Sequence, residues 1–85
     1  MKTQTITVNS NHAEVDSIKG FSIEEDASGA AYIRLRKGSS SGDIVHRLRL
    51  AADQTGTITF TTALTCEGGC YVEEVSGSVA GELYY

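Results

Sequence analysis

Apolar and polar residues alternate along this chain of 85 residues, and the alternation is clearest in residues 30–50. Every second residue is apolar in 31–36, and the alternation resumes in 44–50. A period of two places successive side chains on opposite faces of a sheet. The Gly- and Ser-rich segment 37–43 has the composition of a turn. The sequence therefore predicts an antiparallel hairpin with one apolar face and one face that carries arginines.

The same alternation recurs on both sides of this hairpin and predicts further short strands. These strands are residues 2–8 (an edge strand), 21–25, 56–62, 71–75 and 78–85. Segment 10–18 is ambiguous, because Asn11 could cap a short helical turn, and 63–69 is predicted to be a loop. Seven short strands with regular turns are typical of a small antiparallel β-sandwich or barrel. We expect one all-β domain over residues 1–85.

Size and charge limit the classes of partner. A chain this short buries only about 60–65% of its unfolded surface, so contacts with partner subunits would add stability. The net charge of −4 argues against a general nucleic-acid binder, which is normally basic. No apolar run approaches the ~20 residues of a membrane-spanning helix, and the N-terminus lacks the apolar segment of a signal peptide. We expect no nucleic-acid or membrane partner, and synthesis in a cytoplasm without export by that route.

The charge is unevenly distributed, since five of the seven basic residues lie in the central hairpin. Residues on one face of paired strands stand about 5 Å apart, so these arginines repel unless acidic groups cover them. Either a neighbouring strand or a partner supplies those acidic groups. Alternatively the arginines are simply solvated, since an exposed ion pair would stabilise the fold by only about 0–1 kcal/mol. The candidate interaction surface comprises Tyr32, Arg34, Arg36, Arg47, Arg49, Tyr84 and Tyr85, the last two as anchors at a subunit contact.

Cys66 and Cys70 flank a Glu-Gly-Gly segment and leave three alternatives open. They are free thiols in a reducing compartment, a small-loop disulfide in an oxidising one, or part of a metal site. Zinc needs four ligands, and His12 and His46 lie far from the cysteines in sequence, so a metal site is the least favoured alternative. We expect no metal and no other cofactor.

No motif for catalysis stands out. The two histidines lie in no recognisable catalytic pattern. Segment 38–42 follows Lys37 and precedes a predicted strand, whereas a phosphate-binding loop connects a strand to a helix and ends in lysine. The acidic segment 24–26 lacks the ligand spacing of a calcium loop. We therefore expect a protein that is not an enzyme.

Residues 30–85 resemble small β-sandwich virion proteins of tailed bacteriophages. The matching elements are an R-L-R-x-G strand (34–38), a G-x-I-V strand (42–45), an L-A-A turn (50–52) and a terminal Y-V-E-x-V-S-G-S-V-x-G segment (71–81). Cys66 and Cys70 depart from this pattern. The resemblance implies a structural protein of the phage particle and transfers no active-site residue.

Capsid decoration is the role that this resemblance favours, with the chain bound to the shell exterior as an oligomer. The implied partners are identical subunits and the major capsid protein or another virion protein. Symmetric shells offer three-fold sites, so we expect a trimer. The alternatives are a neck or tail adaptor, or a carbohydrate- or receptor-binding module of a tail or fibre. Such a module would use Tyr32, Tyr71, Tyr84 or Tyr85 as stacking platforms.

Overall fold

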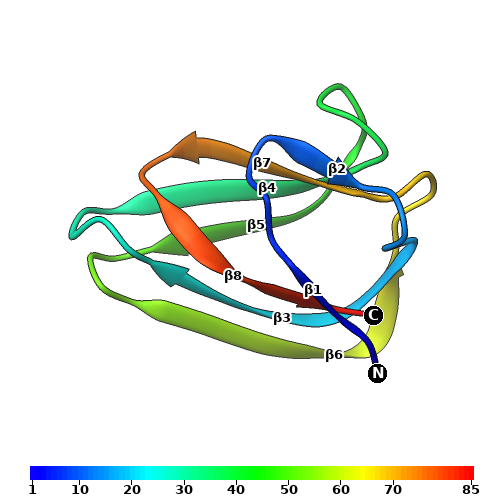
Figure 1. Cartoon of the computed structure of the whole chain (residues 1–85), viewed down its shortest axis with the longest axis horizontal. Coiled ribbons are helices and arrows are strands. Elements are labelled where there is room, and N and C mark those ends of the chain that lie inside the picture. The colour runs from blue at the N-terminus through cyan, green and yellow to red at the C-terminus, as the bar shows by residue number, and fades with distance from the viewer.

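A computed structural model describes all 85 residues as two antiparallel four-stranded sheets packed face to face (Figure 1). The first sheet has the order β1 (Thr3–Thr5), β8 (Val79–Tyr84), β3 (Ser17–Glu25), β6 (Thr55–Thr65). The second sheet has the order β2 (Ser10–His12), β7 (Cys70–Ser76), β4 (Ala31–Lys37), β5 (Ile44–Leu50). The predicted all-β sandwich is confirmed. No helix with the length and apolar character needed to cross a membrane is present.

The central hairpin forms β4 and β5, as the alternation predicts. Ala31 lies opposite Leu50 and Ile33 lies opposite Leu48, so the apolar residues of both strands share the inner face. The register shifts after Leu35, where β5 contains one extra residue. Such a bulge bends the strand and increases its twist beside the turn.

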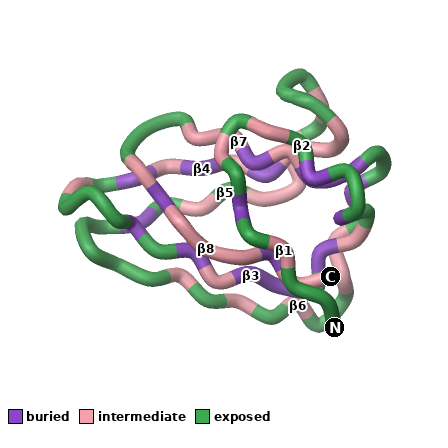
Figure 2. The backbone as a smooth tube through the Cα atoms, in the orientation of Figure 1, coloured by how far each residue is buried: buried purple, intermediate pink, exposed green.

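The core lies between the two sheets and is made of inward-facing residues from both. Figure 2 shows short buried stretches alternating with half-buried or exposed ones along the strands. The buried cluster comprises Ile6, Val15, Ile18, Phe21, Ile23, Ala31, Ile33, Leu35, Leu50, Cys66, Cys70, Val72, Val79 and Leu83. Full burial of one large apolar side chain stabilises a fold by about 1.5–3 kcal/mol. Contact between the two sheets is therefore the main source of stability.

The N-terminal quarter differs from the sequence prediction. The helical turn that residues 10–18 could have formed is absent, and β2 there pairs with β7. Strand β1 is shorter than the predicted 2–8, because the chain leaves the first sheet after Thr5 and joins the second at Ser10. A strand of three residues is too short to show a period, so β2 raises the number of strands from the predicted seven to eight.

Strand β6 extends through Thr65 and occupies part of the segment 63–69 that the sequence predicts as a loop. Its pairing with β3 shifts between Gly20, opposite Thr59, and Ile18, opposite Leu64. This irregularity lets β6 bend upward at its C-terminal end (Figure 1). A Cβ on Gly20 would meet the carbonyl oxygen of Ile58 at 2.4 Å, so a residue without a side chain permits the close approach.

A buried carboxylate ends β3 and connects two turns at one end of the sandwich. Glu25 is 3% exposed, and its two oxygens accept hydrogen bonds from the N–H groups of Asp53 (2.8 Å) and Ala27 (2.7 Å). These donors, Asp53 above all, hold the pKa of Glu25 below its ordinary value of 4.5. The ionised carboxylate therefore joins the turn after β3 to the turn before β6.

We predict that Glu25→Gln lowers the free energy of unfolding at pH 7, because an amide nitrogen would face a backbone N–H that the carboxylate accepts. The folded-state pKa lies below 4.5, so the stabilisation is present above pH 4.5 and is lost as pH falls through the folded-state pKa. Urea unfolding at several pH values measures both effects. Glu24→Gln, at the exposed neighbouring position, is the matched control. Equal loss in both variants would contradict the assignment.

Candidate interaction surface

Aromatic and basic side chains gather on the outer face of the second sheet. Alternation in β4 and β5 directs them away from the core, and register brings Tyr32 opposite Arg49 and Arg34 opposite Arg47. We call this face the Tyr–Arg surface and define it by Tyr32, Arg34, Arg36, Arg47 and Arg49. The structure thus brings together the five hairpin residues that the sequence analysis singles out.

One acidic residue from the neighbouring strand neutralises part of this surface. Strand β7 pairs with β4 so that Glu73 lies opposite Arg34. Its Oε1 accepts hydrogen bonds from Nε of Arg34 and from Nε of Arg36, the latter at 3.1 Å. The Arg34 hydrogen bond holds the pKa of Glu73 below its usual range and raises the pKa of Arg34. For these two arginines, a strand of the same chain supplies the covering acid.

The other two arginines lie on the edge strand β5 and are exposed. The guanidinium of Arg49 lies 4.0 Å from the centre of the Tyr32 ring, a cation–π contact, and Arg34 lies 5.8 Å from the same centre. Neither Arg47 nor Arg49 forms an ion pair. The uncompensated positive charge of the Tyr–Arg surface is therefore concentrated at its β5 side.

The C-terminal tyrosines do not join this surface. Tyr84 belongs to β8 in the first sheet, where it lies opposite Thr3 on one side and Gly20 on the other. Tyr85 packs against the edge of the core, with the Lys2 ammonium 5.9 Å from its ring centre. Sequence alone does not place them, because the sheet to which the last strand belongs depends on long-range pairing.

Cys66 and Cys70 are free thiols and are completely buried. Interaction between the two thiols lowers the pKa of Cys66 and raises that of Cys70, where burial acts in the same direction. A tight turn holds them, since the N–H of Gly69 donates to the carbonyl of Cys66 at 3.0 Å. Closure of a disulfide under oxidation stays an open alternative.

The two histidines have separate structural environments. Nδ1 of the buried His12 lies 2.8 Å from the carbonyl oxygen of Cys70, and its Nε2 accepts a hydrogen bond from the N–H of Thr7 at 3.0 Å. His46 packs against Phe21 and Phe60 with ring centres 5.5 and 5.4 Å away, and burial lowers its pKa. The structure contains no group of three or more His, Cys, Asp or Glu side chains placed to hold a metal ion.

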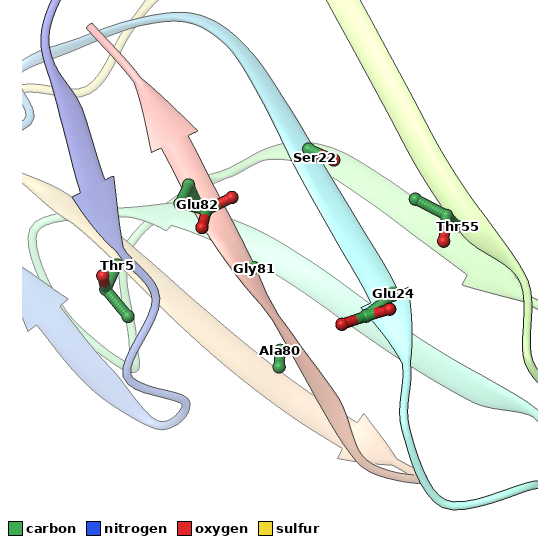
Figure 3. Close-up of a pocket in the computed structure, with 7 residues that line it drawn as sticks. All are labelled: Thr5, Ser22, Glu24, Thr55, Ala80, Gly81 and Glu82. Carbon is green, nitrogen blue, oxygen red and sulfur yellow. The ribbon is translucent and has the colours of Figure 1, made fainter.

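A shallow groove of about 370 Å³ crosses the outer face of the first sheet, and the sequence analysis does not identify it. All four strands of that sheet contribute to its lining, which is Thr5, Ser22, Glu24, Thr55, Ala80, Gly81 and Glu82 (Figure 3). Ser22 lies opposite Glu82 on β8, and its hydroxyl is 3.2 Å from that of Thr57 on β6. The groove therefore offers hydroxyls and carboxylates, in contrast to the arginines of the opposite face.

No known family model, curated protein or solved structure matches this chain. The chemistry of the two outer faces and of the sheet edges is therefore what bears on function.

We predict that Glu73→Gln destabilises the fold, because it leaves Arg34 and Arg36 beside Arg47 without a countercharge. The loss should be greatest at low ionic strength, since salt screens the repulsion among the three guanidinium groups. Denaturant unfolding at low and high salt measures it. Glu74→Gln, whose carboxylate makes no hydrogen bond or ion pair, is the control. A salt-independent effect would contradict the electrostatic explanation.

Proposed function

We propose that this chain is a non-enzymatic structural protein of a phage particle that decorates the outside of the capsid as an oligomer. Its Tyr–Arg surface faces an acidic patch of the shell. One observation carries this assignment: an acidic chain of net charge −4 presents Arg47 and Arg49 on one face without a carboxylate partner. The resemblance of residues 30–85 to phage sandwich proteins supports it independently.

The physical chemistry of this surface suits docking against a protein. Complementary charge steers association and fixes the orientation of the partners. Contact with the Tyr32 ring limits the freedom of the Arg49 guanidinium before binding, so less side-chain entropy is lost when a partner carboxylate pairs with it. The hairpin tip beside the surface, residues 38–43, contains exposed serines and gives the partner a second point of contact.

In this proposal the chain is made in the host cytoplasm and ends in the virion. Its partners are copies of itself and the major capsid protein or another virion protein. A neck or tail position would use the same surface against a different acidic partner.

We predict that the double variant Arg47→Glu with Arg49→Glu no longer binds to particles that lack this protein. The reversed charges would face the acidic patch, while the Arg34–Glu73–Arg36 pairs that support the fold stay intact. Co-sedimentation of purified chains with such particles measures binding. The control with the same change in net charge is Lys2→Glu with Lys19→Glu, two exposed positions outside the Tyr–Arg surface.

Two results would contradict the proposal. One is binding of the arginine variant to the particles as strongly as the wild type. The other is absence of the chain from purified wild-type particles, analysed by mass spectrometry.

A carbohydrate-binding module is the second candidate, and the groove on the first sheet favours it. Glu82 lines the groove, and Tyr84 lies two residues further along β8, on the same outer face. Carboxylates beside an aromatic ring provide both hydrogen bonds and a stacking surface for a sugar. Tyr32 is less suited to this role, because the Arg49 guanidinium lies over its ring.

Titration with a panel of saccharides, followed by tyrosine fluorescence, separates the two candidates. The decoration proposal predicts no saturable change with any saccharide. The alternative predicts binding that Glu82→Gln weakens roughly tenfold or more and that Glu67→Gln, an exposed position outside the groove, leaves unchanged.

A further inference from the structure

Strand β6 is a free edge of the first sheet, and before its bend it lacks the features that usually protect such an edge. It is 11 residues long, Thr55–Thr65, and contains no charged residue and no proline. Natural edge strands are normally short or carry charges, prolines or bulges that prevent pairing with another chain. The other three edges are protected: β1 and β2 have three residues each, and β5 carries arginines. Before its bend, β6 is therefore open to pairing.

The backbone of β6 is oriented for such pairing. The N–H of Glu25 donates to the carbonyl of Gln54 at 2.9 Å. In an antiparallel ladder every second residue of a strand hydrogen-bonds to the neighbouring strand, so this bond determines which β6 residues bond to β3. Gly56 and Ile58 then direct their backbone groups toward β3. The N–H and C=O groups of Thr55, Thr57 and Thr59 consequently point to the free edge, and all three residues are exposed.

The core also reaches the surface along this edge. Leu48 on β5 and Ile58 and Phe60 on β6 pack against the core but are only partly buried. The two strands contact each other across the sandwich at this side, and the Leu48 side chain lies 3.4 Å from where a Cβ of Gly56 would be. If another strand paired with β6, the inward-facing side chains of that strand would cover Leu48, Ile58 and Phe60 and remove their apolar surface from water.

We propose that β6 pairs antiparallel with β6 of a second copy, about a two-fold axis near Thr57, and joins two first sheets into one continuous sheet. This inference rests on the self-association that the proposed function includes. It is separate from docking through the Tyr–Arg surface, which lies on the outer face of the other sheet.

Symmetry and charge select a second copy as the occupant. A two-fold axis places β6 opposite the same strand of the second copy, so a charge at the axis would face the identical charge, and β6 has no charged residue. With Thr57 at the axis, Thr55 lies opposite Thr59 of the second copy. The exposed face then carries a row of paired threonines, which hydrogen-bond across strands.

The remaining edges fit this role less well. Pairing of two β5 strands would bring Arg47 and Arg49 beside the arginines of the other copy. A three-fold ring would need β6 to pair with a different edge of the next copy, and each of those is short or bears arginines. The structure therefore points to a dimer contact in place of the three-fold contact that capsid symmetry suggests.

Sedimentation velocity of the purified chain, from micromolar to submillimolar concentration, tests the proposal. We expect the wild type to dimerise and Thr57→Lys to dimerise roughly tenfold more weakly or worse, because two lysines would face each other at the axis. Thr57→Pro removes an N–H that points to the free edge, together with the hydroxyl beside Ser22, and breaks no backbone hydrogen bond to β3, so it should also prevent dimerisation. Thr57→Ser should dimerise normally, as should Thr3→Lys, the matched change on the short edge β1. Circular dichroism and thermal unfolding show whether each variant is folded.

Register is tested with Thr57→Cys. Residues in a hydrogen-bonded antiparallel pair have Cα atoms about 5.5 Å apart, which permits a disulfide. Oxidation should therefore link two copies through position 57, as mapped by mass spectrometry, and Thr3→Cys should not link them.

A wild type that stays monomeric at every concentration would overturn the inference, as would a trimer. A dimer that persists in both Thr57→Lys and Thr57→Pro would overturn it too. Particle binding separates this inference from the proposed function. If the chain is monomeric but binds particles, the edge pairing fails alone. If it dimerises through β6 but is absent from particles, the decoration role fails alone.

Discussion

Contact between two apolar sheet faces is the constraint on which the rest of this structure depends. In a chain this small the core consists of 14 buried residues, and 11 of them lie on strands, mostly at alternate positions. Each strand that sends one residue into the core must send the next into water. The residues that face outward are therefore free to differ between the layers, and they do: arginines and tyrosine cover one layer, hydroxyls and carboxylates the other. The proposed functions are carried on surfaces that the core does not constrain.

Buried polar side chains complete the fold where strands end. Glu25 binds the backbone of two turns, and His12 connects the segment after β1 to the start of β7. Burial of such groups is unfavourable unless hydrogen bonds replace those to water, and in both residues two polar side-chain atoms have a backbone partner. The apolar faces thus hold the layers together, while these polar contacts determine how the chain passes between strands and between layers.

Local patterns in the sequence predict the fold class and the central hairpin, including which face of it carries the arginines. They do not predict strand order, and the omissions on the two outer faces follow from that. Glu73 becomes the partner of Arg34 only because β7 lies beside β4. The groove forms because β8 lies between β1 and β3, and the same arrangement takes Tyr84 away from the Tyr–Arg surface. Two further differences are local. Strand β2 is too short to show a period, and no glycine, proline or other residue type in β6 marks the position of its bend.

The positions of the edge and of the two faces make the two proposed contacts compatible. Antiparallel pairing at a sheet edge is related by a two-fold axis perpendicular to the sheet, so equivalent faces of both copies point the same way. In a β6-paired dimer the two Tyr–Arg surfaces would therefore lie on one side and the two grooves on the other. Two weak, charge-dependent contacts on the same side can bind to one shell at the same time. Because the two copies are joined through β6, the second contact forms as an intramolecular step. The charge-free edge of β6 would therefore have a role in binding: by joining two copies, it would give the dimer two Tyr–Arg surfaces and make its attachment to the shell bivalent.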